Sequence, residues 1–211
     1  MPDDAQEKGT ARENLCRFLA ACYYQPGPEF AEEKVFDSMF DAATRIHPDL
    51  AAHARRLGAE FSAEGPESLL VDYTRLFLGP SHIIAKPYGS VWLDGEETLM
   101  QDSTMAVQEL YEEGGFEINE DFRELPDHIA AELEFLYLLI YRENEARRND
   151  DPEALTAMAG LRKRFLDEHL GSWVGPFTAA VKAGAQSGFY RELAELTDRF
   201  VKMEASEDKA A

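Results

Sequence analysis

The chain has 211 residues, of which 45% are hydrophobic and 11% aromatic, a composition that supports one globular domain and excludes a disordered chain. Its 41 Asp and Glu residues against 21 Lys and Arg give a net charge of −20, which disfavours nucleic acid and anionic lipid as partners. Such a surface would attract a basic peptide, although on charge alone solubility is the simpler explanation.

The first predicted helix follows Thr10 and Glu13, which form a capping box, and the turn residues QPGP (25–28) should end it. Cys16 and Cys22 lie on this helix about 9 Å apart along its axis, too far for a disulfide. With no other cysteine and no adjacent histidine they make a poor metal site. We expect two buried apolar thiols.

Three more helices are predicted before residue 80. An amphipathic stretch begins at Glu29, and Pro48 and Pro66 suit the first turns of a third and a fourth helix. Gly79 with the following proline should end the fourth. Residues 80–101 then show no helical repeat, and a loop of this length is often functional. Short strand-like pairing around its sequence SVWL is a minor expectation.

Helices resume at DSTMAVQELYEEGG (102–115), with Asp102 or Ser103 as cap and Gly114 as stop. An acidic link, FEINEDFRELP (116–126), leads to a long helix expected from Pro126 to about Arg147.

The remaining pattern is also helical. Asp151 and Pro152 predict the start of a helix that reaches about His169. The sequence GSWVGPF (171–177) should break it, two shorter helices should follow, and the tail should fray. The sequence therefore predicts an all-α protein.

The stretch ELPDHIAAELEFL (124–136) carries the residues with most chemistry. Asp127 alone is best explained as a helix cap. His128 and Glu132, four residues apart, could face one metal ion, but a single pair falls short of the three or four ligands of a usual zinc site. Glu132 and Glu134 point in different directions, which disfavours a concerted acid/base pair.

Signatures of catalysis are otherwise missing, because the chain has no phosphate-binding loop with a lysine, no GxSxG and no GxGxxG. The loop residues Tyr88 and Trp92 place aromatic surface on an outer segment, where core packing and binding are both open interpretations for Trp92. Residues 107–135 contain ten acids and one base, Arg123. Aromatic residues with an acidic rim suit a peptide that is basic at one end and apolar along the rest.

Five blocks of sequence support a family resemblance. YTRLFLGP, KPYGSVWLD, QDSTMAVQELYEEGG, ELPDHIAAELEFL and GFYRELAEL occur in the order and approximate spacing of the TorD/DmsD/NarJ family, which the chain resembles from about Leu69 to Phe200. That family consists of redox-enzyme maturation chaperones for molybdenum-containing reductases.

The resemblance implies an all-helical bundle-like fold in a single domain spanning 1–211. Its N-terminal part, about 10–114, and its C-terminal part, about 126–203, would be joined by a hinge at about 115–125, with a long aromatic loop. It implies a cytoplasmic chaperone, not an enzyme, that binds the twin-arginine leader or another segment of an apo-molybdoenzyme catalytic subunit. It would aid cofactor insertion and delay Tat export until maturation is complete.

The peptide-binding residues that the resemblance implies are Phe77, Gly79, Pro87, Tyr88, Ser90, Trp92, Glu124, Pro126, Asp127 and His128. Asp127 would accept hydrogen bonds from a leader arginine or order the loop that does. His128 would add a donor or a stacking face.

No catalytic residue, metal or cofactor of its own is expected. The molybdenum-cofactor supply and the Tat machinery are further partners that the resemblance allows, and nucleic acid is not a partner. No apolar run approaches the ~20 residues of a membrane span, and the polar start MPDDAQEKGT is unlike a secretory signal, so we expect a cytoplasmic protein without membrane insertion. Monomer and domain-swapped dimer stay open. The alternatives are a small nucleotide-binding protein or enzyme, and a structural assembly subunit.

Overall fold

The computed structural model describes residues 2–27, 30, 34–79, 83–95, 101–118 and 123–207. Within these ranges the regular structure consists of helices and one isolated β-bridge, which confirms the predicted all-α fold. In chain order the elements are α1 (Pro2–Cys22), α3 (Val35–Ile46), α4 (Pro48–Tyr73), the π-helix η1 (Thr74–Leu78), α5 (Gly89–Leu93), α6 (Asp102–Gly114), α7 (Ile129–Arg148), α8 (Pro152–Glu168), α9 (Leu170–Gly184) and α10 (Gly188–Glu207). None of the described helices is both long and apolar enough to cross a membrane.

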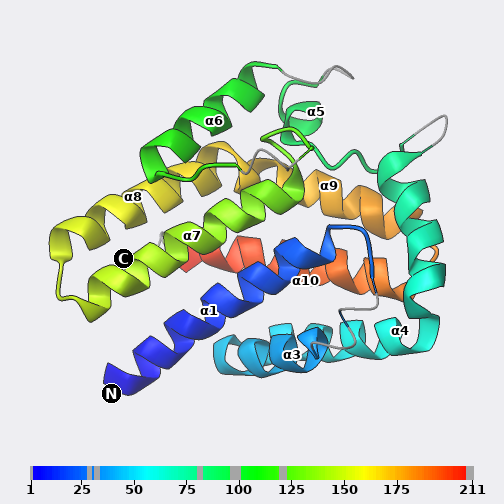
Figure 1. Cartoon of the computed structure of the whole chain (residues 1–211), viewed down its shortest axis with the longest axis horizontal. Coiled ribbons are helices and arrows are strands. Elements are labelled where there is room, and N and C mark those ends of the chain that lie inside the picture. The colour runs from blue at the N-terminus through cyan, green and yellow to red at the C-terminus, as the bar shows by residue number, and fades with distance from the viewer. Residues whose placement is uncertain are drawn as a thin grey trace.

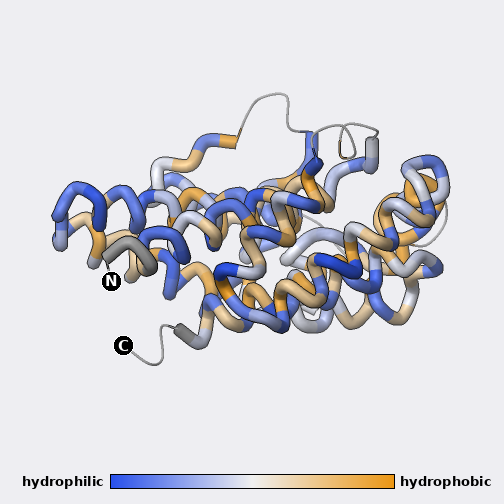
Figure 2. The backbone as a smooth tube through the Cα atoms, turned by 90° about the horizontal axis from the view of Figure 1, so that it is seen from below, coloured by the Kyte–Doolittle hydropathy of each residue, from blue (hydrophilic) through white to orange (hydrophobic). Residues whose placement is uncertain are grey.

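The long helices pack as a bundle in which distant parts of the chain meet. Helix α1 lies along α7 and α3, α4 packs on α3 and α10, and α9 packs on α10, α8 and α5. Figure 1 shows α5 and α6 at one side of the molecule and α3 at the opposite side. Figure 2 shows hydrophobic and hydrophilic residues alternating along the helices, as expected where each helix buries one face.

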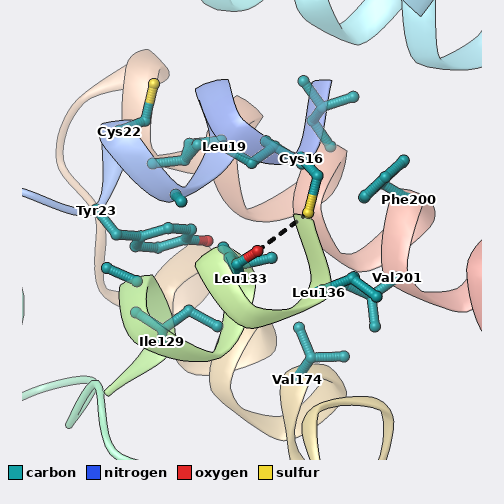
Figure 3. Packing of buried hydrophobic residues seen from close by; sticks show 14 of the residues in the cluster. Cys16, Leu19, Cys22, Tyr23, Ile129, Leu133, Leu136, Val174, Phe200 and Val201 are labelled. Atoms are coloured by element: carbon teal, nitrogen blue, oxygen red, sulfur yellow. Dashed lines mark hydrogen bonds between the residues drawn. The ribbon is translucent and has the colours of Figure 1, made fainter. Parts of the chain in front are cut away.

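The core joins residues of the first and last helices to those of α7. In the part shown in Figure 3, Leu19 of α1, Leu133 of α7 and Phe200 of α10 are all fully buried. Cys16 and Cys22 lie in the same core as free thiols, and the Cys16 thiol donates to the Leu133 carbonyl oxygen at 3.2 Å. The expectation of two buried, unpaired cysteines is confirmed.

A buried ionic network ties four helices together beside this core. The Arg12 guanidinium of α1 donates from Nε to Glu204 of α10 at 2.7 Å, and Arg162 of α8 donates from Nε to Glu143 of α7 at 2.5 Å. Arg162 also lies 3.4 Å from the Glu204 carboxylate, so the pairs form one network. All four residues are buried, and their charges compensate one another there.

The first helix begins earlier than predicted. Helix α1 starts at Pro2 and passes through Thr10, so Thr10 is not its cap. Gly9 lets α1 approach α7 closely, because a Cβ atom there would lie 2.5 Å from the side-chain oxygen of Asn144. The close approach of α1 to α7 at Gly9 holds residues in the helix that local signals alone do not place there.

The helices between residues 34 and 79 follow the prediction more closely. Helix α3 begins at Val35, while Glu29 lies outside the described residues. Pro48 occupies the first turn of α4, and Gly65, with φ 74°, interrupts that helix before Pro66, as the two-helix expectation requires. Gly79 ends η1, donating its N–H to the Thr74 carbonyl at 2.7 Å.

The strand-like pairing expected around SVWL is wrong. Residues Gly89–Leu93 form the short helix α5, and the one bridge nearby joins Tyr88 to His128. The N-cap position of α6 is Gln101 rather than Asp102 or Ser103, without a side-chain capping bond, and the helix ends at Gly114 as expected.

The C-terminal helices also correct two boundaries, the starts of α7 and α9. Helix α7 begins at Ile129, three residues after Pro126, with His128 as its N-cap. The break between α8 and α9 falls at His169, and residues 171–177 lie inside α9, because Trp173, Val174 and Phe177 are all fully buried.

Asp151 caps α8 as predicted, whereas α10, with 20 residues, is as long as α7 and not shorter. The described part of the tail, to residue 207, is helical. The hinge at about 115–125 includes residues 119–122, which lie outside the described ranges, and the two-part organisation stays a prediction.

Candidate functional site

The two sequence blocks with most of the predicted site residues lie side by side. The Gly89 N–H donates to the Asp127 carbonyl and the Ile129 N–H to the Pro87 carbonyl, each at 2.8 Å. These bonds flank the antiparallel bridge between Tyr88 and His128. We call residues 86–92 with 124–129 the junction.

Asp127 fastens α5 to the start of α7. Its side chain is fully buried, and its Oδ2 atom accepts the Ser90 backbone N–H at 2.8 Å. Ser90 is the second residue of α5, so Asp127 satisfies an end group of α5 and not of α7. The Asp127 carboxylate has no solvent-facing surface.

His128 caps α7 instead. Its Nδ1 atom accepts the Ala130 N–H at 3.2 Å, and its ring meets Tyr88 edge to face at 5.4 Å between centroids. Burial lowers the pKa of His128 to about 4, against the opposing charges of Glu124 and Asp127. His128 is therefore neutral at pH 7, with Nδ1 as the acceptor.

The Glu132 carboxylate contacts α9 and its N-terminal flank rather than His128, the residue with which it could have faced a metal ion. Its Oε2 atom accepts the Trp173 indole N–H at 3.0 Å, and its Oε1 atom lies 3.7 Å from His169 Nδ1. Burial raises the pKa of Glu132, while His169 and Trp173 lower it. In the described ranges no group of three or more His, Cys, Asp or Glu side chains is placed to hold a metal ion.

The outer rim of the junction is aromatic and acidic. The Tyr88 hydroxyl donates to Glu124 at 2.5 Å, and the Tyr24 hydroxyl donates to Glu134 at 2.7 Å. Glu124 is exposed and both tyrosines are partly exposed. Burial, reinforced by the neighbouring carboxylates, raises the pKa of Tyr24 and of Tyr88, and burial with Glu124 raises the pKa of Tyr73 to about 12. Each tyrosine hydroxyl therefore stays protonated and can donate a hydrogen bond.

Trp92 packs against the core and is also partly exposed. Its indole N–H donates to the Lys86 carbonyl at 2.9 Å, its ring lies edge-on to Phe177 at 6.3 Å, and part of it stays exposed. Buried Phe77 contacts the same Phe177 ring at 6.2 Å.

The other predicted residues lie within the junction or, for Gly79, at the end of η1. Pro87 and Ser90 are buried, and the Pro126 carbonyl accepts the Tyr111 hydroxyl at 2.8 Å. Gly79, partly exposed, lies at the end of η1, and the Ala85 N–H returns to the Leu76 carbonyl of that helix at 2.9 Å. The chain thus brings Pro87, Tyr88 and Ser90 onto Glu124 and 126–128, with Trp92 and Phe77 connected through Phe177.

Sequence reasoning missed the support beneath α5. A Cβ atom on Gly89 would lie 2.9 Å from Trp173 Nε1 and 3.0 Å from Glu132 Oε1, so α5 sits directly on these two side chains. Glycine in the sequence YGSVW was the available signal, but Trp173 lies too far along the chain for any local pattern to connect them.

The arrangement suits binding more than bond-making chemistry. The rim offers a carboxylate and tyrosine hydroxyls next to partly exposed aromatic rings, which suits a peptide carrying a cation and apolar side chains. Burial raises the pKa of both thiols, that of Cys22 to about 12, which keeps them protonated and poor nucleophiles.

Comparison with known proteins supports the family resemblance, and four of the five sequence blocks lie within the residues that the family model matches. The family model described as "Nitrate reductase delta subunit" matches residues 38–179. A chaperone protein TorD from Vibrio parahaemolyticus is 30% identical over 139 residues, 65% of this chain and 63% of its own length. A Tat proofreading chaperone DmsD from Salmonella typhi is 33% identical over 168 residues, 78% of this chain and 80% of its own.

The chain therefore aligns with somewhat less than two thirds of the TorD relative and with four fifths of the DmsD relative. Among solved structures, a proposed redox enzyme maturation protein from Archaeoglobus fulgidus shares the fold, with a TM-score of 0.53 and 24% identity over 90% of this chain and 93% of that one.

Proposed function

The chain belongs to the nitrate reductase delta subunit family, which includes the TorD and DmsD chaperones, and we propose that it is a maturation chaperone for a redox enzyme. Its client is the catalytic subunit of a molybdenum-containing reductase, and the segment it binds is the twin-arginine leader or another stretch of that subunit. It acts in the cytoplasm before Tat export, and it is not an enzyme.

The observation that carries the proposal is the exposed Tyr88–Glu124 pair on the junction. Glu124 presents a carboxylate to solvent, and a guanidinium can bind such a group through two parallel hydrogen bonds. Tyr88 and Trp92 lie alongside as partly exposed rings, which suit the apolar stretch of a leader.

Buried Asp127 and His128 act behind this surface. They fix the two backbone segments in register through the Ser90 N–H bond and the α7 cap. Because these bonds hold Tyr88 next to Glu124, the rim is ordered before any peptide arrives, and less conformational entropy is lost on binding. Of the two roles predicted for Asp127, we therefore propose the second, ordering of the loop.

The test is a titration of the chain with a fluorescent twin-arginine leader peptide at low and moderate salt. A second peptide has both arginines replaced by glutamine. We expect saturable binding to the first, weaker at moderate salt, and at least about tenfold weaker binding to the second, because a charged hydrogen-bonded contact contributes about 1.5–3 kcal/mol.

Glu124→Gln tests the surface within the same titration. We expect it to weaken leader binding about tenfold, whereas Glu67→Gln, an exposed acid on α4, should leave binding unchanged. Equal binding by both peptides would remove the arginine contact from the proposal. Lack of binding to leaders from several molybdenum reductases would contradict the export-chaperone function.

A further inference from the structure

An aromatic groove lies on the outer face of α3 and α4, away from the junction. It is a hollow of about 640 Å³ whose lining includes four phenylalanines, Phe30, Phe36, Phe40 and Phe61. A second hollow of about 470 Å³ adjoins it and shares Phe40 and Arg55 with it. We call these two hollows together the α3–α4 groove.

Two glycines give the groove its shape. A Cβ atom on Gly58 would lie 3.0 Å from Phe36 Cβ, so this glycine lets Phe36 pack close to α4, where its ring lies tilted against Phe61 with 4.6 Å between the centroids. Gly65, at the kink with φ 74°, has open space where its side chain would be, and with Pro66 it lines the end of the first hollow.

Among the described residues, the groove carries two cations that have no ion-pair partner. Arg55 lies over the Phe40 ring at 4.6 Å, and Lys34 lines the first hollow. Both are exposed, and neither forms an ion pair within the described ranges. By contrast, the neighbouring Arg56 pairs with Glu192 at 3.0 Å.

This charge arrangement is unusual for a chain with a net charge of −20. The one acid that lines the groove in the described part of the chain is Asp37. An arginine on an aromatic face with free N–H groups favours a carboxylate ligand that also buries apolar surface.

We propose that the α3–α4 groove is a second docking site, for an acidic amphipathic helix of a partner protein. Two adjoining hollows accept two apolar side chains from one face of a helix, and Asp or Glu residues beside them meet Arg55 and Lys34. The site is distinct from the junction, since Figure 1 places α3 at the opposite side of the molecule from α5 and α6. The inference does not depend on the proposed leader binding.

A second copy of this chain is the less suitable occupant. The large hydrophobic side chains that are exposed in the described residues are Val71, Leu78 and Met105, which belong to three different elements. Scattered side chains of this kind do not form the continuous apolar helix face that the groove would receive.

The test uses a synthetic helical peptide with leucines on one face and glutamates on its flanks. A second peptide has the glutamates replaced by glutamine. Binding to the full chain is measured by fluorescence anisotropy, with unlabelled leader peptide as competitor. We expect the acidic peptide to bind about tenfold more tightly than the neutral one, and the leader not to displace it.

Matched variants locate the binding. Ala59→Trp places an indole in the groove, and Ala63→Trp places one at an exposed position of the same helix outside it. We expect the first to abolish binding of the acidic peptide, the second to leave it unchanged, and Arg55→Gln to weaken it about fivefold. Circular dichroism confirms that all three fold.

Four results would overturn the proposal: equal binding of both peptides, no binding of either, binding that survives Ala59→Trp, or displacement by the leader. Sedimentation of the chain alone tests the second copy as occupant. A dimer that Ala59→Trp dissociates would assign the groove to a second copy and contradict a partner helix.

Discussion

His128 and His47 make the same hydrogen bond at the start of two helices, but their surroundings differ. In each, Nδ1 accepts the N–H two residues ahead at 3.2 Å. His47 is exposed, whereas His128 is buried beside Tyr88 and has its pKa lowered to about 4. The burial of one cap makes the stability of the junction depend on pH.

The sign of this dependence follows from proton binding. Unfolded His128 titrates near its ordinary pKa of about 6.5 and folded His128 near 4, so below pH 6.5 the unfolded state binds more protons. The free energy of unfolding should fall by as much as about 3 kcal/mol between pH 6.5 and 4 from this residue. Glu132, whose pKa burial raises, acts in the opposite direction.

We expect urea unfolding at pH 7, 6, 5 and 4 to show this loss in the unaltered chain and to show much less of it in His128→Asn. Asparagine can still accept the Ala130 N–H but does not titrate. His47→Asn is the matched control and should keep the steep dependence. The same slope in both variants would assign the effect to other groups.

Asp127 shows what residue identity leaves open. A carboxylate next to proline at a helix start was expected to cap that helix, yet it serves the N–H of Ser90, 37 residues earlier in the chain. Both interpretations satisfy the same local rule, that a carboxylate near orphan N–H groups is stabilising. Which N–H groups are near it is a property of the folded chain.

At the scale of the element, α5 depends on Gly89, a residue without a side chain. Five residues are too few for a stable isolated helix, so tertiary contacts must hold it, among them the Asp127 bonds and the packing of Gly89 on Trp173 and Glu132. The sequence predicted a loop here, because residues 80–101 show no helical repeat.

Gly89→Ala should therefore lower the free energy of unfolding by about 1–3 kcal/mol, because the added methyl overlaps Trp173 and the Glu132 carboxylate. Gly160→Ala in α8 is the control, since nothing lies within 4 Å of its Cβ position. It should stabilise the chain by about 0.5–1 kcal/mol through helix propensity. Urea unfolding measures both, and a Gly89→Ala variant as stable as the unaltered chain would contradict the close packing of α5.

At the scale of the whole molecule, the buried ionic network fixes how the N-terminal helix meets the C-terminal helices. Arg12 and Glu204 are 192 residues apart in the chain, and they are joined through Arg162 to Glu143. Helical periodicity cannot predict which of these residues pair. It shows only that each helix carries a charged residue on its buried face.

Removing Arg162 should leave buried Glu143 with only the half-exposed Arg147 as its partner, and buried Glu204 with only Arg12. Arg162→Met should cost about 3–5 kcal/mol of unfolding free energy, whereas Lys163→Met, next to it on the exposed face, should change it by less than about 1 kcal/mol. Chemical denaturation of both variants measures the difference. Similar values would show that the network contributes little to holding the four helices together.

The sequence by itself determined the all-α class, most of the helices, the buried unpaired cysteines and the family, because helical periodicity, turn residues and sequence blocks are local features. The tertiary structure decided where α1 starts, that SVWL is helical, and that Asp127 and His128 serve different helices. It also decided that Trp173 and Glu132 lie beneath Gly89. These features depend on side chains that approach from distant parts of the chain, and such contacts override weak local preferences.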